Sequence, residues 1–516
     1  MKTDYLILGS GLAGLSFGAL MAKAGKKVVI LEAHDCPGGY GHTFSEGNLY
    51  RFNAQFHYVW NCGEGRVVHN FLKKLNLHHD VTFEKYDCDR YDHNRMPNFA
   101  LDIPSDLQVL ITRLQALFPS HARNIKNFIT EVEQTADALD KLPIPLNPPF
   151  LLSNPRSSYH LFKYRNATLQ QVFDQFQLPL AAQTLLALQW PDFLLPPRDL
   201  SFFAWATLFM GYCRGAYYPT KHFESVINAL VKTIEDNGGN IIYNRKITQF
   251  IRNGKTITGV LADDLNNSGQ ISEHHGTDII CNIDPKKAAE MIGFEHFSHS
   301  VQRKLLYDYS PSNFMAYCVV KDLDLRDYGF GKWNVFHTEQ EDLNQAFDDM
   351  YLRGDYSKPS FVITTPSLLT NDHSDCPENC QIIEFLTVAN YDRFHDLKIS
   401  DAAQYRQKKK EIFDAIIAVV EKHYIPNFSQ HLVFKMTGSP TTNQRFCGSP
   451  AGNSYGSNLT PKNLNLNRLN HQTSLKHFYF CNASSGFPGF TGTIKTGSVL
   501  YEHLSGDFFV KGDKTP

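Results

Sequence analysis

The sequence carries little net charge and has no concentrated basic segment. Its 50 Lys and Arg residues nearly balance its 52 Asp and Glu residues, so the formal charge is -2 and the pI is about 6.9. Proteins that bind nucleic acid neutralise phosphates with a basic patch or stripe. We therefore expect no nucleic-acid partner for this chain.

The sequence also lacks the cysteine patterns of disulfide frameworks and zinc sites. Its ten cysteines are scattered, with no CxxC pair and no paired Cys/His spacing. Frameworks and zinc sites both need regular spacing, so we expect reduced thiols, no metal and a cytoplasmic protein. A strand pattern begins within the first few residues, and we expect no cleavable leader before it.

No apolar run reaches the about 18 residues that cross a bilayer. The richest segments are 142–155 (LPIPLNPPFLLSNP), 190–205 and 200–213 (LSFFAWATLFMGYC). They are too apolar for solvated loops, and they suit either core and linker or a ligand tunnel with a membrane-contacting lip. From 142–155 and 200–213 we expect peripheral contact with a membrane.

What the sequence does have is a dinucleotide-binding fingerprint at its N-terminus. An apolar strand leads into Gly9-x-Gly11-x-x-Gly14, a helical pattern follows, and a second apolar strand closes at Glu32. The first glycine permits a tight turn, the second lets the backbone approach a pyrophosphate, and the third lets helix and strand pack. Glu32 is placed to accept hydrogen bonds from ribose hydroxyls and would repel a 2'-phosphate, which favours FAD or NAD over NADP.

A second glycine motif, PGGYGHTF, follows the second strand directly. Gly38 and Gly39 suit a backbone that crosses close to a pyrophosphate and a ribityl chain, which a simple NAD domain does not need. The alternative is a glycine turn with a surface His42. Together with the fingerprint, the motif favours FAD.

Two later stretches continue this domain. Residues 215–293 give a helix, a Gly-Gly stop, alternating strands and then a buried strand that leads into a helix, and residues 476–504 give a strand, a glycine-rich turn and a helix. The last helix, entered through Gly489 and Gly492, can aim its N-terminal amides at a flavin edge. Residues 76–214 are helical and proline-punctuated, and residues 300–440 are mixed α/β.

The expected fold class is therefore α/β, since 516 residues exceed what one core usually supports. We assign residues 1–75, 215–300 and 440–516 to a discontinuous FAD-binding Rossmann-like domain. Residues 76–214 and 301–439 would form an inserted α+β substrate domain that also contacts the membrane.

Several motifs resemble one flavoprotein superfamily, that of carotenoid desaturases, carotenoid isomerases and retinol saturases. They are GGYGHTF followed by FNAQFHYVW, GAYYP, ICNIDP, GSPTTNQRF and GSPAGNSYG, and GAYYP and SPTTNQ are most similar to the saturase branch. The resemblance implies non-covalent FAD in a fold of the glutathione-reductase/amine-oxidase type, a hydrophobic tunnel, and chemistry that adds, removes or rearranges hydrogens on an isoprenoid polyene. It carries cofactor contacts to Gly9, Gly11, Gly14, Glu32, Gly38, Gly39, His42, Thr43, Gly489 and Gly492.

The chain departs from the family pattern in two places. Where the family usually has Gly-Asp after the last strand, this chain has Asn482-Ala483-Ser484, and Ser484 can still hydrogen-bond a ribityl hydroxyl. The glycines expected after YYP are replaced at 220–222, and the Asp-Thr-Gly expected before HY is replaced at 53–55. These changes bear on the identity of the substrate more than on the identity of the cofactor.

The nominated catalytic pair is His57-Tyr58. A polyene offers neither an acidic proton nor a carbonyl, so hydride transfer to or from a flavin needs little acid–base machinery. Histidine titrates near neutrality and tyrosine can donate, so this pair could deliver a proton. The alternative is a buried aromatic pair with satisfied hydrogen bonds.

Four functions stay open. The first is a polyene-acting FAD oxidoreductase, and the second is a flavin desaturase or isomerase of long-chain fatty acyl groups. The third is a flavin amine oxidase, and the fourth is a non-catalytic prenyl carrier resembling GDP dissociation inhibitors. No second GxGxxG flanked by strands is present, so a quinone, oxygen or a separate reductase is the expected electron partner.

Overall fold

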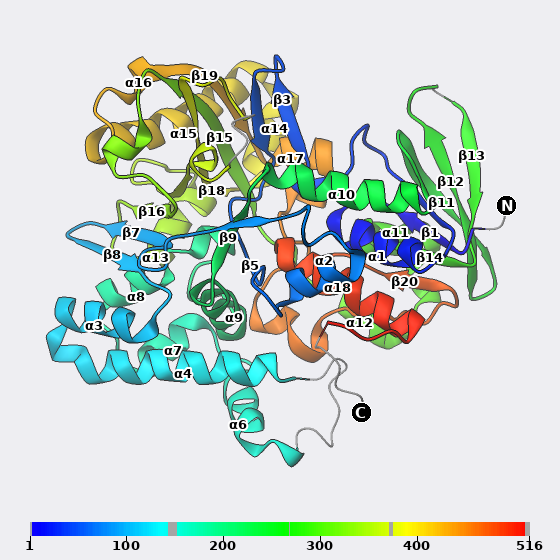
Figure 1. Ribbon diagram of the computed structural model, residues 1–516, viewed down its shortest axis with the longest axis horizontal. Helices are drawn as coiled ribbons and strands as arrows, with labels where there is room; N and C mark the ends of the chain where they lie inside the picture. Colours follow the sequence, from blue (N-terminus) through cyan, green and yellow to red (C-terminus); the bar gives the residue numbers. More distant parts are fainter. Residues whose placement is uncertain (1–2, 143–151, 268, 371–374, 511–516) are drawn as a thin grey trace.

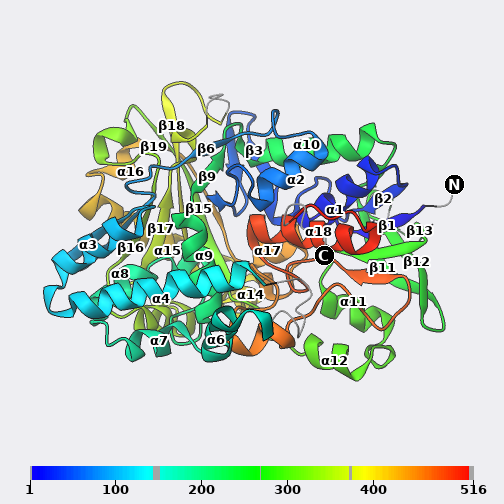
Figure 2. The ribbon, with the colours of Figure 1, turned by 60° about the horizontal axis from the view of Figure 1, so that its bottom comes forward.

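The computed structural model describes residues 3–142, 152–267, 269–370 and 375–510. Figures 1 and 2 show two lobes side by side, one built around a parallel sheet and one around a larger mixed sheet. This is an α/β fold with a Rossmann-like dinucleotide-binding lobe, as the sequence predicts.

The parallel sheet forms the centre of the first lobe. Its strands come from distant parts of the chain, in the order β10 (Asn240–Ile242), β2 (Val28–Leu31), β1 (Tyr5–Leu8), β14 (Asp278–Cys281) and β20 (Phe478–Phe480). Each neighbouring pair is parallel. The carboxyl ends of the strands therefore meet at one edge, where ligands bind in open α/β sheets.

Alternate residues of β1 serve two hydrophobic cores, because successive strand residues point to opposite faces. Ile7 packs into the core formed with three helices, α1 (Leu12–Lys23), α10 (His222–Asp236) and α18 (Gly489–Ser505). Leu6 and Leu8 join the second core, which contains residues of the antiparallel sheet and of α11 (Pro285–Ile292). That sheet comprises β11 (Arg245–Asn253), β12 (Thr256–Asp264) and β13 (Ile271–His275), and α12 (His299–Leu305) follows α11.

The second lobe is built on a mixed sheet. Its strand order is β19 (Leu432–Gly438), β15 (Ser312–Lys321), β18 (Cys380–Ala389), β17 (Ser360–Thr364), β16 (Asn334–Thr338), β7 (Asp92–Met96) and β8 (Phe99–Ile103). Every residue from Ser312 to Val320 of β15 is buried. The helices of this lobe are α3 (Leu107–Leu117), α4 (Ala122–Asp140), α6 (Pro155–Tyr164), α7 (Leu169–Gln175), α8 (Leu180–Ala187), α9 (Phe202–Cys213), α13 (Leu343–Phe347), α14 (Tyr391–Ser400), α15 (Ala402–His423), α16 (Phe428–His431) and α17 (Pro440–Cys447).

Small sheets lie between the lobes, and one further helix joins the first lobe. β3 (Thr43–Glu46) pairs with β4 (Tyr50–Asn53), and β9 (Ala216–Pro219) lies between β5 (Val59–Trp60) and β6 (Phe83–Lys85). α2 (Val67–Leu75) packs against α18. The chain thus passes between the lobes beside the segment that carries His57 and Tyr58.

Two expectations from the sequence were wrong. Residues 76–214 are not helical throughout, because β7 and β8 form a hairpin that pairs in parallel with β16. A polar first strand, DHNRM, hides the hairpin in the sequence, although Asp92 and Asn94 are buried. The GAYYP segment is likewise strand β9 and not the start of α10.

Two apolar segments, 142–155 and 200–213, were expected to contact a membrane. Residues 200–213 contain α9, whose Trp205 has no exposed surface, so this helix is core and not a membrane lip. Most of 142–155 lies outside the described residues. Among the described helices, none has the length and apolar character needed to cross a bilayer.

Candidate functional site

A cavity of about 760 Å³ lies between the two lobes. Its lining runs from the glycine loops of the first lobe to apolar side chains of the second. This volume is in the range of cofactor and ligand sites in proteins. Of the eleven residues that the sequence nominates for cofactor binding, eight line it, namely Gly9, Gly11, Glu32, Gly38, Gly39, His42, Ser484 and Gly489.

The fingerprint loop is fixed by an asparagine that the sequence reasoning missed. Asn282, after β14, donates from Nδ2 to the carbonyl oxygens of Gly9 (3.1 Å) and Gly11 (3.3 Å). A Cβ on Gly11 would lie 2.8 Å from this amide nitrogen, and a Cβ on Gly14 would lie 2.8 Å from the Gly9 carbonyl oxygen. Gly11 and Gly14 are therefore required by packing, and the first turn of α1 is left to face the cavity.

Glu32 lies at the end of β2 and lines the cavity. Its Oε2 accepts from the backbone N–H (2.7 Å) and hydroxyl (2.6 Å) of Ser10, and its Oε1 accepts from His34 N–H (2.8 Å). A carboxylate has about four acceptor positions. Glu32 is thus oriented by the chain and retains capacity to accept from the hydroxyls of a ribose.

The second glycine motif packs against the first. Gly38 pairs with Gly11 in an isolated bridge, and its φ of 110° is a conformation that side chains rarely adopt. Nδ1 of His42 is 2.7 Å from the carbonyl oxygen of Gly39. Burial lowers the pKa of the His42 ring, so the ring is neutral near pH 7. Thr43 is not on the cavity wall, and its hydroxyl contacts His222.

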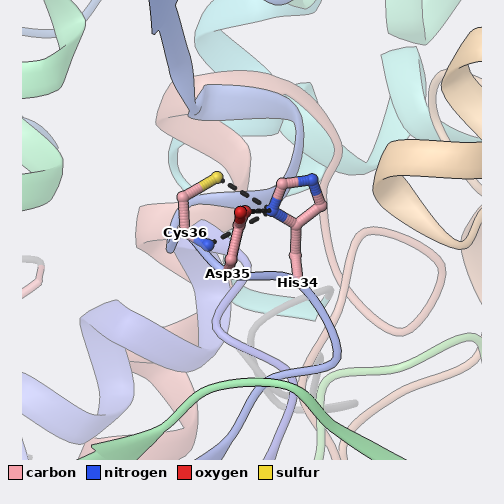
Figure 3. A group of neighbouring side chains, drawn as sticks. All are labelled: His34, Asp35 and Cys36. Carbon is pink, nitrogen blue, oxygen red and sulfur yellow. Dashed lines mark hydrogen bonds and ion pairs between the residues drawn. The ribbon is translucent and has the colours of Figure 1, made fainter. Parts of the chain in front are cut away.

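Three consecutive side chains after Glu32 lie close together (Figure 3). His34 Nδ1 is 2.6 Å from Asp35 Oδ1 and 3.1 Å from Cys36 Sγ. Such a group can in principle hold a metal ion, but burial, then Asp35, raises the pKa of Cys36 to about 11. The contacts of His34 with Asp35 and Cys36 make the group a hydrogen-bonded turn beside the Glu32 end of the cavity.

A second group of this kind lies in the other lobe. Glu339 contacts His337 (3.1 Å) and His423 (2.7 Å). However, Lys422 is 3.1 Å from Glu339, and Arg95 donates to His423. Two cations already surround the group, so it is best described as a charged hydrogen-bond network.

The C-terminal turn after β20 is shaped by Asn482, Ala483 and Ser484. Asn482 Oδ1 accepts from the backbone N–H of Ser484 and Ser485, so this side chain holds the turn and is not free to contact a ribityl chain. Ser484 lines the cavity, whereas Gly492 does not, and a Cβ on Gly492 would lie 2.8 Å from the Phe487 backbone.

A buried arginine supports the same turn and was also missed. Arg468 donates to the carbonyl oxygens of Ala483 (2.6 Å) and Gly486. Burial lowers the pKa of its guanidinium to about 10, so it remains charged at neutral pH. The turn beside the cavity therefore rests on a buried positive charge.

The second-lobe part of the cavity is mainly apolar. Its walls contain side chains from the segment after η3 (Trp190–Asp192), from α9, from β18 and from the segment before β20. They include Phe193, Leu194, Leu208, Leu386 and Leu459, and Trp60 of β5 and Phe490 of α18 border them. We call this region the apolar arm, and its surface suits a hydrocarbon chain.

His57 and Tyr58 both line the cavity, and they meet two buried carboxyl groups that the sequence reasoning missed. Tyr58 donates its hydroxyl to Asp192 Oδ2 (2.9 Å) and lies 3.4 Å from Asp92 Oδ2. His57 Nε2 is 3.6 Å from Asp192 Oδ1. The Tyr58 ring stacks on Tyr212 with centroids 3.8 Å apart.

The sequence contains one indication that Asp192 has a function, and none for Asp92. Asp192 stands in the apolar run QWPDFLLPP, where an acid is costly to bury without a role. Asp92 stands in a polar stretch whose burial nothing in the sequence reveals.

Comparisons with known proteins agree with this geometry. A family described as an NAD(P)-binding Rossmann-like domain matches residues 7–75. All-trans-retinol 13,14-reductase from Danio rerio is 22% identical over 96% of this chain and 86% of its own length. Prolycopene isomerase 2 from an Oncidium hybrid cultivar is 22% identical over 94% of this chain and 80% of its own length. The chain is thus a distant full-length relative of both kinds of protein.

A solved structure shows the same fold. Putrescine oxidase bound to putrescine superposes with a TM-score of 0.65 at 11% identity, over 98% of this chain and all of the other. At this identity the likeness concerns the fold alone. The chain therefore has the architecture of the FAD-binding amine oxidases, and its sequence relatives have retinol- or carotenoid-related names.

Proposed function

We propose that this protein is an FAD-dependent oxidoreductase that acts on the C=C bonds of a long isoprenoid polyene, a carotenoid or a retinoid. Saturation, desaturation and cis-trans isomerisation are the reactions considered. The proposal depends on one observation above all: a single cavity joins the dinucleotide loops to the apolar arm.

The residues present fit FAD. The glycines of the fingerprint leave room for a close backbone approach, Glu32 is positioned for a ribose, and Gly38 and Gly39 continue the same wall. The first turns of α1 and α18 both contribute residues to the cavity, and helix N-termini favour phosphate and other anionic groups. When bound, the flavin would supply hydride transfer.

The chain's own residues would position the substrate and exclude water. A polyene in the apolar arm would displace water from Phe193, Leu194 and Leu208, and its burial would contribute about 25 cal/mol per Å². The arm also keeps a reactive, electron-rich chain away from solvent. Polar groups reach the cavity at His57 and Asp192, where proton transfer to the substrate is possible.

The amine oxidase alternative is less well supported. Amine sites of that type use an aromatic cage, which requires two rings that face the substrate across a gap. Tyr58 and Tyr212 are instead stacked on each other with an interplanar angle of 3°. Fatty acyl chains suit the apolar arm as well as polyenes do, and substrate tests must separate them.

Peripheral membrane contact remains part of the proposal. On α6, Tyr159 and Phe162 are each 59% exposed, and Leu152 just before it is 85% exposed. Figure 1 shows α6 projecting from the second lobe. Exposed aromatic and aliphatic side chains of this kind suit a lipid surface. The electron partner is a quinone, oxygen or a separate reductase.

The deciding experiment is an anaerobic titration of the purified flavoprotein. Retinol, carotenoids, unsaturated fatty acids and amines are added in turn to the oxidised and the reduced protein, and the flavin absorbance is followed. Reoxidation of the reduced flavin by a polyene indicates a saturase, and bleaching of the oxidised flavin indicates a desaturase. A change of polyene geometry without net redox indicates an isomerase.

Other outcomes of that titration would contradict the proposal. A response to fatty acids alone would identify an acyl-chain enzyme, and peroxide production from amines would identify an amine oxidase. A colourless protein that FAD cannot reconstitute would indicate a carrier.

A further inference from the structure

We propose that Asp192 is the acid–base residue of the cavity, and that Asp92 stores its proton and exchanges it through the hydroxyl of Tyr58. The inference rests on the proposed function for its catalytic role, but the shared proton is a property of the protein alone. It replaces His57-Tyr58 as the nominated proton donor and makes Tyr58 and Asp92 positioning residues.

Asp192 is the one of the two carboxyl groups that reaches the cavity. Its side chain is 6% exposed and lines the cavity beside Phe193 and Leu194. Oδ2 accepts from Tyr58, whereas Oδ1 has no hydrogen-bond partner among the described residues. At 3.6 Å, His57 is too distant for a hydrogen bond. A buried carboxyl oxygen without a partner is costly, and such atoms call for a functional explanation.

Asp92 is the buried end of the group. It has no exposed surface, and its Oδ2 accepts from Gln189 and lies 3.4 Å from the Tyr58 hydroxyl. Burial first, and then the neighbouring Asp192, raises the pKa of Asp92 well above its usual range. Two carboxyl groups that share one site cannot both ionise easily, so Asp92 retains a proton at neutral pH.

Tyr58 is the connection between the two carboxyl groups. Its phenol pKa is raised well above the usual value by burial and then by Asp192 and Asp92, so its hydroxyl keeps a proton. Its ring is immobilised on Tyr212. A hydroxyl can accept one proton while it donates another. A proton on Asp92 can thus move to Tyr58 oxygen as the proton of Tyr58 moves to Asp192.

The surroundings keep the proton in this group. The titratable groups that face it are all neutral acids or a histidine, and no Lys or Arg among the described residues forms an ion pair with either Asp92 or Asp192. The facing groups are His57, Tyr86, Tyr91, Tyr212, Cys213 and Tyr455, with Glu384 farther away. No nearby cation therefore forces both carboxyl groups to ionise.

The step balances for saturation of a C=C bond. The O–H bond of Asp192 breaks, its electron pair stays on the carboxylate, and the proton forms a C–H bond with one carbon of the double bond. The other carbon would take a hydride, two electrons and one hydrogen nucleus, and a reduced flavin held at the glycine loops would supply it as the reductant. Water then restores the proton of the pair. In desaturation, the carboxylate of Asp192 takes the proton instead.

Infrared spectroscopy of the holoenzyme tests the stored proton without turnover. The carbonyl stretch of a protonated carboxyl group is separate from that of a carboxylate. At pH 7 we expect such a band, and Asp92→Asn should remove it. The matched control is Glu384→Gln, because Glu384 is another buried acid, with a pKa raised to about 8, and it does not line the cavity. Glu384→Gln should remove the carbonyl band of Glu384 and leave that of Asp92.

Kinetics test the catalytic role. Asp192→Asn should lower kcat by about 10²–10⁴-fold, the range of general acid–base catalysis, while polyene binding, followed by fluorescence, changes by less than about threefold. Tyr58→Phe keeps the ring stacked on Tyr212 and both carboxyl groups, so it should keep the Asp92 band and lower kcat. In D₂O, the wild type should place a solvent deuterium, at a fixed stereochemistry, on the carbon that Asp192 protonates.

The experiments distinguish failure of the stored proton, of the catalytic role of Asp192 and of the proposed function. No Asp92-dependent band would overturn the stored proton, and full turnover by Asp192→Asn would overturn its role as acid. If Asp92→Asn does not fold, Tyr58→Phe and Asp192→Asn still decide the kinetics. A wild-type protein that is inert toward every polyene would refute the proposed function and the catalytic role with it, while the infrared bands would still decide whether the pair shares a proton.

Discussion

The side-chain amide of Asn282 donates to the Gly9 carbonyl oxygen, which ties the end of β14 to the fingerprint loop after β1. The same nitrogen also donates to Gly11. One side chain thus holds the carbonyl groups of both residues that flank Ser10 and fixes the turn before α1. The loop geometry depends on a residue about 270 positions away from it.

Asn282→Ala should therefore weaken FAD binding more than it destabilises the fold. Each lost hydrogen bond contributes about 0.5–1.5 kcal/mol, so flavin affinity should fall by roughly ten- to a hundredfold. The measurement is titration of the apoprotein with FAD. The control is Asn237→Ala, which removes a similar bond to Thr233 at the end of α10. Equal flavin affinity in the two variants would contradict this role.

Glu32→Gln should weaken FAD binding by about tenfold, because hydrogen bonds to an ionised acceptor are about twice as strong as neutral ones. Glutamine also offers one acceptor oxygen where Glu32 uses two, for Ser10 and His34. Flavin retention on gel filtration is the readout. Asp35→Asn is the matched control, since Asp35 is exposed and does not line the cavity. If both variants retained flavin equally, the ribose assignment would be wrong.

How much the sequence could predict differs between the two lobes. The fingerprint, Glu32 and the second glycine motif are local patterns whose chemistry follows from backbone geometry. Most of the residues nominated from them line the cavity, whereas Gly14 and Thr43 do not. The order of the parallel sheet brings Asn282 to that loop, and no local pattern predicts this contact. Tertiary packing alone reveals that a polar strand such as β7 is buried and that Asp92 meets Asp192.

Glu384 should make the protein lose stability as pH rises. Burial, then Asp375, raises its pKa from 4.5 to about 8. The folded state therefore holds a proton that the unfolded state has lost, so stability from this group is complete below about pH 4.5 and falls until about pH 8. The loss is on the order of 5 kcal/mol at most.

Denaturant unfolding between pH 5 and pH 8 measures this effect. Glu384→Gln should flatten the decline of unfolding free energy over that range, because glutamine does not titrate. A wild-type curve with the same slope as the variant would show that Glu384 ionises normally.

The exposed face of α6 should mediate contact with lipid. Tyr159→Ser with Phe162→Ser removes two side chains that are each 59% exposed, so co-sedimentation with liposomes should fall while the fold and flavin content stay unchanged. Leu306→Ser is the matched control, because Leu306 is 67% exposed just after α12 in the other lobe. If the α6 variant binds liposomes as the wild type does, or if the wild type does not bind them, α6 is not a membrane contact. If α6 delivers substrate from a bilayer, the double variant should also lose turnover with polyene in liposomes and retain it with polyene in detergent.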